Sequence, residues 1–166
     1  MVLKFRNIDT SDWSPTWKSS EQPRKQRKYL INAPIHIRRK IMVSPLSKEL
    51  KKLLKIRAIP IVIGDYVKVL RGKFRNSEGY IVYVDAKRYR VYVDSAKFTN
   101  KKGKEVYYPI HYSKVEILKL NLTDKKRIET IKRRVKDESL IEKLLKDYSV
   151  KEEDVNKAKQ IYSSIK

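Results

Sequence analysis

The stretch IGDYVKVLRGKFRNSEGYIVYVD, residues 63–85, carries the clearest structural signal in this chain. Within it, residues 66–70 alternate apolar with polar or amphipathic side chains, which is typical of a strand that buries one face. Residues 80–84 are rich in β-branched and aromatic side chains, which also favour a strand. Glycines bound the segment between these two runs, so the stretch predicts two strands joined by a loop.

The loop of this predicted unit runs from Gly72 to Gly79 and is basic. Cations and backbone donors on a loop between rigid strands are well placed to bind a ligand. An ordinary hairpin with a solvated loop is the alternative interpretation. The loop residues that we expect to contact a polyanion are Arg71, Lys73, Arg75 and Asn76.

Further strand signals follow the hairpin. Residues 87–94 alternate strictly between two faces, and short strands are predicted at 106–108 and 115–118. A basic turn before the strand at 106–108 makes Lys101 and Lys102 further candidates for polyanion contact. About five short strands in some sixty residues favour a small, mainly β barrel, because closure removes exposed strand edges.

The charge of the chain is large and unevenly distributed. Its 166 residues include 41 Lys and Arg and 19 Asp and Glu, which gives a formal net charge of +22. The net charge is +23 through position 136 and −1 from Asp137 onward. Because such a charge opposes compaction, it indicates a polyanionic partner, with nucleic acid first and a membrane surface second.

The segment 22–48 is basic throughout, with eight Lys or Arg residues and no acidic one. Such a run can be only a solvated face. Solubility alone favours mixed signs, however, whereas a phosphate backbone would neutralise this run and release counterions. We therefore predict RNA contact, with aromatic and imidazole rings available for stacking. The candidate residues are Arg24, Lys25, Arg27, Lys28, Tyr29, His36, Arg38, Arg39 and Lys40.

Two short helices are predicted near this basic segment, after an irregular start over residues 1–23. Asn32 can cap a helix over 34–42, with proline in its first turn. A second helix over 45–54 carries leucines at helical spacing, which predicts a buried apolar stripe.

Three amphipathic helices are predicted after position 120, starting near Asp124, at Asp137, and after Ser149, which has capping-box spacing to Glu152. They can pack on each other, on the barrel or on a neighbouring protein. A near-neutral apolar face is a better candidate for a protein partner than for RNA. The predicted organisation is a basic arm with two helices over 1–60, a barrel over 61–120 and a helical extension over 121–166.

The sequence excludes several kinds of chemistry. It has no cysteine, so disulfides and thiolate metal sites are excluded. Its two histidines, His36 and His111, lie far apart in the sequence, and no carboxylate cluster, phosphate-binding loop or zinc spacing occurs. No stretch resembles a transmembrane segment or a signal peptide. We expect a cytoplasmic protein that is not an enzyme, with no cofactor, metal, small-molecule substrate or membrane partner.

Six motifs occur in a fixed order: PRKQRK at 23–28, APIHIRRKIM at 33–42, SPLSKEL at 44–50, the hairpin, KRYRVYV at 87–93 and YPIH at 108–111. The hairpin resembles the KOW motif, with Asn76 where a second glycine is usual; asparagine tolerates a left-handed backbone. In this order the motifs resemble the large-subunit ribosomal protein family numbered twenty-four in bacteria and twenty-six in eukaryotes, in its archaeal and eukaryotic form.

This resemblance implies a five-stranded SH3-like barrel with a basic N-terminal arm and an α-helical C-terminal extension. It implies binding to large-subunit rRNA near the nascent-chain exit tunnel and an early role in subunit assembly. Neighbouring large-subunit proteins are implied partners, with the C-terminal helices as the candidate contact. The alternative is a KOW-domain transcription elongation factor that binds RNA polymerase, a class that shares only the hairpin with this chain.

Overall fold

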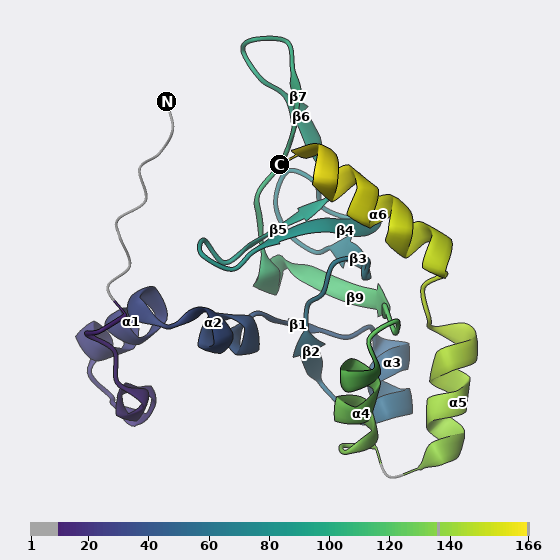
Figure 1. The fold of residues 1–166 in the computed structure, drawn as a ribbon, viewed down its shortest axis with the longest axis horizontal. Helices are drawn as coiled ribbons and strands as arrows, with labels where there is room; N and C mark the ends of the chain where they lie inside the picture. The colour runs from purple at the N-terminus through teal and green to yellow at the C-terminus, as the bar shows by residue number, and fades with distance from the viewer. Residues whose placement is uncertain (1–9, 136, 166) are drawn as a thin grey trace. The chain divides into compact units, whose positions relative to one another are not determined.

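The computed structural model of this protein describes residues 10–135 and 137–165 (Figure 1). The chain divides into two compact units, Met1–Ile41 and Met42–Lys166. Residues 1–9 of the predicted arm lie outside the described residues.

The first unit is helical. It contains the 3-10 helix η1 (Pro15–Ser19), α1 (Pro23–Asn32) and α2 (Ile35–Ile41). The helix predicted over 34–42 is confirmed as α2, but α1 was missed, although a proline in the first turn is a helix start signal. The Asn32 cap was wrong, because Asn32 belongs to α1 and its amide donates to the carbonyl oxygen of Asp12.

Polar contacts hold this unit together, because no residue of η1 or α1 is buried. Trp13 donates from Nε1 to the carbonyl oxygen of Tyr29 at 3.2 Å, and the two rings lie 5.5 Å apart. The amide of Gln26 donates to three carbonyl oxygens of the η1 segment at 2.6–3.1 Å. Hydrogen bonds from side chains to the backbone therefore hold η1 against α1, in place of an apolar core.

The second unit is built on a five-stranded antiparallel sheet with the order β8-β5-β4-β3-β9. The long central strand β4 pairs with β3 at its start and with β5 at its end, and the register shifts between Ile81 and Tyr83. The strands are β3 (Tyr66–Val69), β4 (Glu78–Asp85), β5 (Arg90–Val93), β8 (Ile110–His111) and β9 (Val115–Lys119). The predicted hairpin and the alternation of Val91 and Val93 into the core are confirmed.

The expected closed SH3-like barrel is not confirmed. Within the part of the chain that the structure describes, β8 and β9 are the two edges of the sheet and do not pair with each other. The fold is mixed α/β rather than mainly β, because six α-helices accompany the sheet over the described residues.

The remaining strands of the described residues form two smaller sheets of two strands each. The pair β1 (Val43–Pro45) and β2 (Ala58–Pro60) flanks α3 (Lys48–Leu54) and was not predicted. The pair β6 (Lys97–Thr99) and β7 (Glu105–Tyr107) forms a hairpin that projects from the five-stranded sheet (Figure 1).

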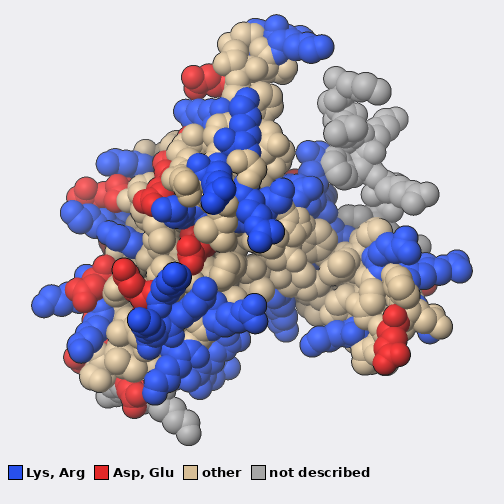
Figure 2. All heavy atoms as spheres, turned by 180° about the vertical axis from the view of Figure 1, so that it is seen from behind, with Lys and Arg blue, Asp and Glu red and all other residues tan. Residues whose placement is uncertain are grey.

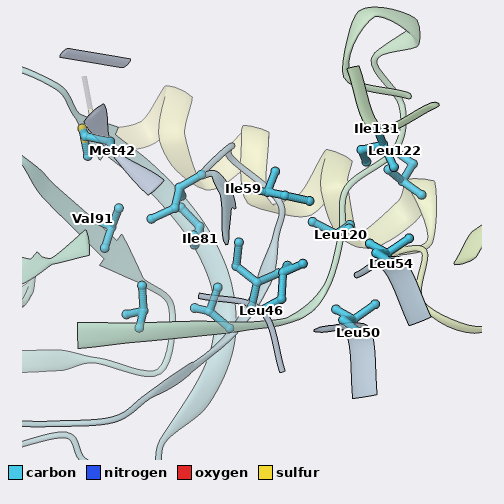
Figure 3. Close-up of a cluster of buried hydrophobic side chains, with 14 of the residues drawn as sticks. Met42, Leu46, Leu50, Leu54, Ile59, Ile81, Val91, Leu120, Leu122 and Ile131 are labelled. Carbon is cyan, nitrogen blue, oxygen red and sulfur yellow. The ribbon is translucent and has the colours of Figure 1, made fainter. Parts of the chain in front are cut away.

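The apolar stripe predicted for the second helix is confirmed, although α3 begins only after Ser47, whose hydroxyl accepts from the backbone N–H of Leu50. Leu50 and Leu54 lie near Leu120 in the apolar core (Figure 3). Leu46 belongs to the same cluster and pairs with Ile117 of β9. All four leucines are at most 2% exposed. The helix therefore closes one end of the apolar core.

The C-terminal extension forms α4 (Lys125–Lys132), α5 (Glu138–Asp147) and α6 (Glu152–Ile165). Of the packing alternatives, the structure shows packing on the protein's own sheet: α6 lies along β4 (Figure 1), with Val155 and Ala158 buried. The Ser149 capping box was wrong, because α6 begins at Glu152, whereas the box requires Glu152 at the third position of the helix. The Ser149 hydroxyl donates to the carbonyl oxygen of Leu145.

A tyrosine of β4 ties α6 to the sheet by a hydrogen bond. The Tyr80 hydroxyl donates to the carboxylate of Asp154 at 2.9 Å. Burial, and next this hydrogen bond, raise the pKa of Tyr80 to about 12. The phenol is therefore neutral, and remains a donor, throughout the physiological pH range.

A buried ion pair joins the extension to the turn before β3. The Asp65 carboxylate, which is fully buried, accepts from Arg127 Nη1 at 2.6 Å and Nη2 at 2.9 Å. It also accepts from the backbone N–H groups of Val62 and Asn121, each at 2.9 Å. Arg127 donates further to the carbonyl oxygens of Pro60 and Asn121. One carboxylate and one guanidinium thus join three segments.

We predict that Asp65→Asn destabilises the second unit by roughly 3–5 kcal/mol, because Arg127 keeps a buried charge without its counter-ion. The double variant Asp65→Asn/Arg127→Met should cost less than the sum of the two single variants, since the two side chains act as a pair. The measurement is urea unfolding followed by circular dichroism.

Glu78→Gln is the matched control for Asp65→Asn. It removes the same charge from an ion pair with Lys68 at 3.2 Å whose side chains are 38% and 35% exposed. Exposed pairs contribute about 0–1 kcal/mol, so this variant should remain close to wild type. Equal unfolding midpoints for the two variants would contradict the structural role of the buried pair.

The packing of α6 generates a second prediction, at Gly64. This residue has φ +88°, and a Cβ there would lie 3.0 Å from Asn121 Nδ2 and 3.1 Å from Val155 Cγ1. Gly64→Ala should therefore cost about 1–2 kcal/mol for the left-handed backbone and roughly 1–3 kcal/mol more for displacing α6. Gly103→Ala is the control, because Gly103 has φ +75° with no atom within 4 Å of a Cβ.

The measurement is again the unfolding free energy of each variant. Gly103→Ala reports the backbone cost alone, so the difference between the two variants isolates the contact with α6. A difference near zero would mean that α6 does not need this close approach.

Candidate nucleic-acid interface

The loop between β3 and β4 is a compact turn held by backbone hydrogen bonds. Asn76 N donates to the Val69 carbonyl oxygen at 2.8 Å, and Arg75 N donates to that of Gly72 at 3.1 Å. Asn76 has φ +65°, so the left-handed conformation expected at this position is confirmed. The predicted site residues of this loop are all exposed: Arg71, Lys73, Arg75 and Asn76.

A hollow of about 160 Å³ lies beside the loop. Its lining combines loop residues with residues from β5, from β8 and from the 3-10 helix η2 (Tyr112–Lys114). The polar and aromatic lining residues are Arg71, Lys73, Phe74, Arg90, Tyr108, His111 and Lys114. Of these, only Arg71 and Lys73 were predicted site residues, because the others meet the loop only through the fold.

The strand pairing explains how the hollow acquires its basic wall. Arg90 of β5 and His111 of β8 are register partners in adjacent strands. The backbone N–H of Leu70 donates to the carbonyl oxygen of Lys114 at 2.8 Å, which fixes η2 beside the end of β3. No signal in the sequence could have shown these pairings, since 21 positions separate Arg90 from His111.

The imidazole of His111 is a neutral donor in this hollow. Burial lowers its pKa, and the nearby charges of Arg90 and Lys114 lower it further. The backbone N–H of Ser113 donates to Nδ1 at 3.3 Å, so Nδ1 is the acceptor and Nε2 carries the proton.

The β6–β7 hairpin presents the other predicted basic turn. Lys101 and Lys102 are exposed at its end. At its base, the Tyr108 ring lies 6.0 Å from that of Phe98 and 5.3 Å from that of Phe74. Tyr108 thus connects the hairpin to the loop between β3 and β4, which we call the KOW loop. Tyr108 is itself 39% exposed.

The predicted residues of the first unit differ in their access to solvent. Lys28 pairs with Asp12 at 2.9 Å. Tyr29 is partly buried against Trp13. Arg38 is only 3% exposed, and its guanidinium donates to the carbonyl oxygens of Ala33 and Ile31. The Arg38 side chain therefore binds the carbonyl oxygens at the end of α1 and is not available to a polyanion in this conformation.

The other predicted residues of the first unit are exposed to solvent: Arg24, Lys25, Arg27, His36, Arg39 and Lys40.

Basic side chains dominate the face of the second unit seen in Figure 2, both on the hairpin at the top and on the surface beneath it. Over residues 10–135 and 137–165, no group of three or more His, Asp or Glu is placed to hold a metal ion. No helix within these ranges has both the length and the apolar character needed to cross a membrane.

Comparison with known proteins agrees with the motifs. A family model that describes the ribosomal proteins L26 of eukaryotes and their archaeal L24 counterparts matches residues 20–134, which includes every element from α1 to α4. The chain is 53% identical over 146 residues to the large ribosomal subunit protein uL24 of Nanoarchaeum equitans (strain Kin4-M). This alignment covers 88% of the chain and 97% of that protein. The resemblance is confirmed, and the chain belongs to the family of eukaryotic L26 and archaeal L24 ribosomal proteins.

Proposed function

We propose that this chain is a structural constituent of the large ribosomal subunit in the cytoplasm and binds large-subunit rRNA. Family membership carries this proposal. The acid-free run of cations in α1 and α2 and the basic hollow beside the KOW loop support it, because both suit a phosphate backbone. The proposed function is binding rather than catalysis.

The proposal also specifies where in the large subunit the protein lies and at what stage of assembly it binds. We place the protein near the nascent-chain exit tunnel and early in subunit assembly, on the family resemblance of its motifs. Neighbouring large-subunit proteins are proposed partners of the outer surface of the C-terminal helices, where Leu145 of α5 is an exposed apolar side chain.

The SH3-like character of the sheet is part of this proposal. The register shift in the middle of β4 supports it, because such irregularities bend a strand and let one strand serve two differently oriented parts of a sheet.

The test of the function is sedimentation of a tagged copy from the source organism. We expect the protein in the large-subunit peak at moderate salt and its release at high salt, since phosphate contacts weaken with ionic strength. Its absence from that peak, with recovery alongside RNA polymerase, would support the transcription-factor alternative and overturn the proposal.

We also predict how the arm binds. Replacing Arg24, Lys25, Arg27 and Lys28 by Ala should weaken binding to a large-subunit rRNA transcript. It should also flatten the dependence of log K on log salt by about 0.7–0.9 for each phosphate that the arm no longer neutralises. Alanine is a strong helix former, so α1 should persist in this variant.

The matched control removes four charges from the extension instead. It replaces by Ala the exposed residues Lys143, Lys146, Lys157 and Lys159. This variant should keep the wild-type salt dependence. The same slope for the arm variant and wild type would mean that the arm is only a solvated face.

A further inference from the structure

The hollow beside the KOW loop concentrates positive charge without any compensating acid. Four cations from three separate elements line it, and its lining includes no Asp or Glu. Within the described residues, none of the four forms an ion pair. The four cations are Arg71, Lys73, Arg90 and Lys114. Because like charges held together repel, an anion of compact shape would be stabilised here.

The same hollow presents aromatic surface. The rings of Phe74 and Tyr108 lie 5.3 Å apart at an angle of 52°, and both line the hollow. A π-face beside clustered cations is the combination that recognises a nucleotide, since the base stacks while the phosphate is neutralised. A bare phosphate or sulfate would leave the two aromatic rings unused.

The backbone of the loop is open to a close approach. A Cβ on Gly72 would meet no atom within 4 Å outside its chain neighbours, so the space on that side of the main chain is open. His111 also lines the hollow, and its Nδ1 accepts from Ser113, so its Nε2 is the ring nitrogen that can donate. Donors of this kind can read the edge of a base or the ribose hydroxyl, whereas charge alone cannot.

The size of the hollow indicates that an unpaired nucleotide, rather than a base-paired one, would enter it. Its volume of about 160 Å³ is roughly ten times what one water molecule needs. A recess of this size can admit one ring system. In a duplex the flat faces of the bases are covered by stacking, so a base can enter a recess only where it is unpaired and splayed out.

We propose that this hollow receives a single unpaired nucleotide of the rRNA, with its phosphate between Arg90 and Lys114 and its base against Tyr108. This inference rests on the proposed rRNA binding and adds a site for one residue of that RNA. The arm cations would then hold the duplex backbone, and the hollow would select one position along it.

The test compares three forms of the full chain on the large-subunit rRNA transcript of the source organism. The first is wild type, and the second is Arg90→Gln/Lys114→Gln. The control, Lys143→Gln/Lys146→Gln, removes the same charge from α5. Chemical probing of 2′-hydroxyls and base edges gives the footprint of each form at single-nucleotide resolution.

We expect protection of one or two unpaired nucleotides that disappears with the pocket variant, while the rest of the footprint persists; the control should match wild type. Tyr108→Ala should weaken RNA binding roughly 5- to 100-fold, the effect expected when a base no longer has its aromatic platform. Thermal unfolding of each variant checks that it remains folded.

The outcomes separate this site from the proposed function. If the pocket variant leaves every protection in place, or weakens all of them equally, the hollow does not select a nucleotide and the inference fails while rRNA binding stands. If wild type gives no footprint, both fail. A titration with 5′-AMP and 5′-UMP tests the other source of this chemistry: saturation by a free monophosphate that the rRNA does not compete away would overturn the assignment to RNA.

Discussion

The second unit is organised around the buried carboxylate of Asp65. Moving a charge out of water is costly, and here Arg127 and two backbone N–H groups offset that cost. Such a pair specifies geometry strongly, because a shift of α4 would separate Arg127 from Asp65 and leave the buried carboxylate with only its two backbone N–H donors. The turn that starts the KOW hairpin therefore has its position fixed by a helix that lies 62 positions later in the chain.

Because of this ion pair, the C-terminal extension has a structural role in the second unit. The sequence predicted a helical extension from position 121 and left open whether it packs on the protein itself or on a neighbour. In the structure α4 binds Asp65, and Val155 of α6 lies against Gly64. Both contacts meet at the same two-residue turn. Since β3 begins immediately after that turn, the extension stabilises the sheet that presents the KOW loop, although it contributes no predicted RNA contact of its own.

The sequence predicted what depends on local pattern and missed what depends on long-range pairing. Alternation placed Val91 and Val93 in the core, and helical spacing placed Leu46, Leu50 and Leu54 there. The left-handed turn at Asn76 was expected from the KOW resemblance, because asparagine tolerates the conformation that the usual glycine would adopt there. The wall formed by Arg90 and His111 required the register of two strands, and the short pair β1–β2 lies too far apart in the chain for any local signal. Arg38 shows a second limit of local pattern, because the sequence does not reveal that this cation of a basic run is buried and donates to the carbonyl oxygen of Ala33.

The positive charge of the chain is therefore not one undifferentiated surface. Part of it is structural, as in Arg38 and Arg127, where guanidinium groups bind carbonyl oxygens or a buried carboxylate. Part of it lies on exposed helical faces of the arm, where the proposed contacts to phosphate would give affinity without reading sequence. Four further cations, Arg71, Lys73, Arg90 and Lys114, line a hollow together with Phe74 and Tyr108. Because this arrangement joins clustered charge to aromatic surface among the described residues, we propose that it is where the protein selects one nucleotide.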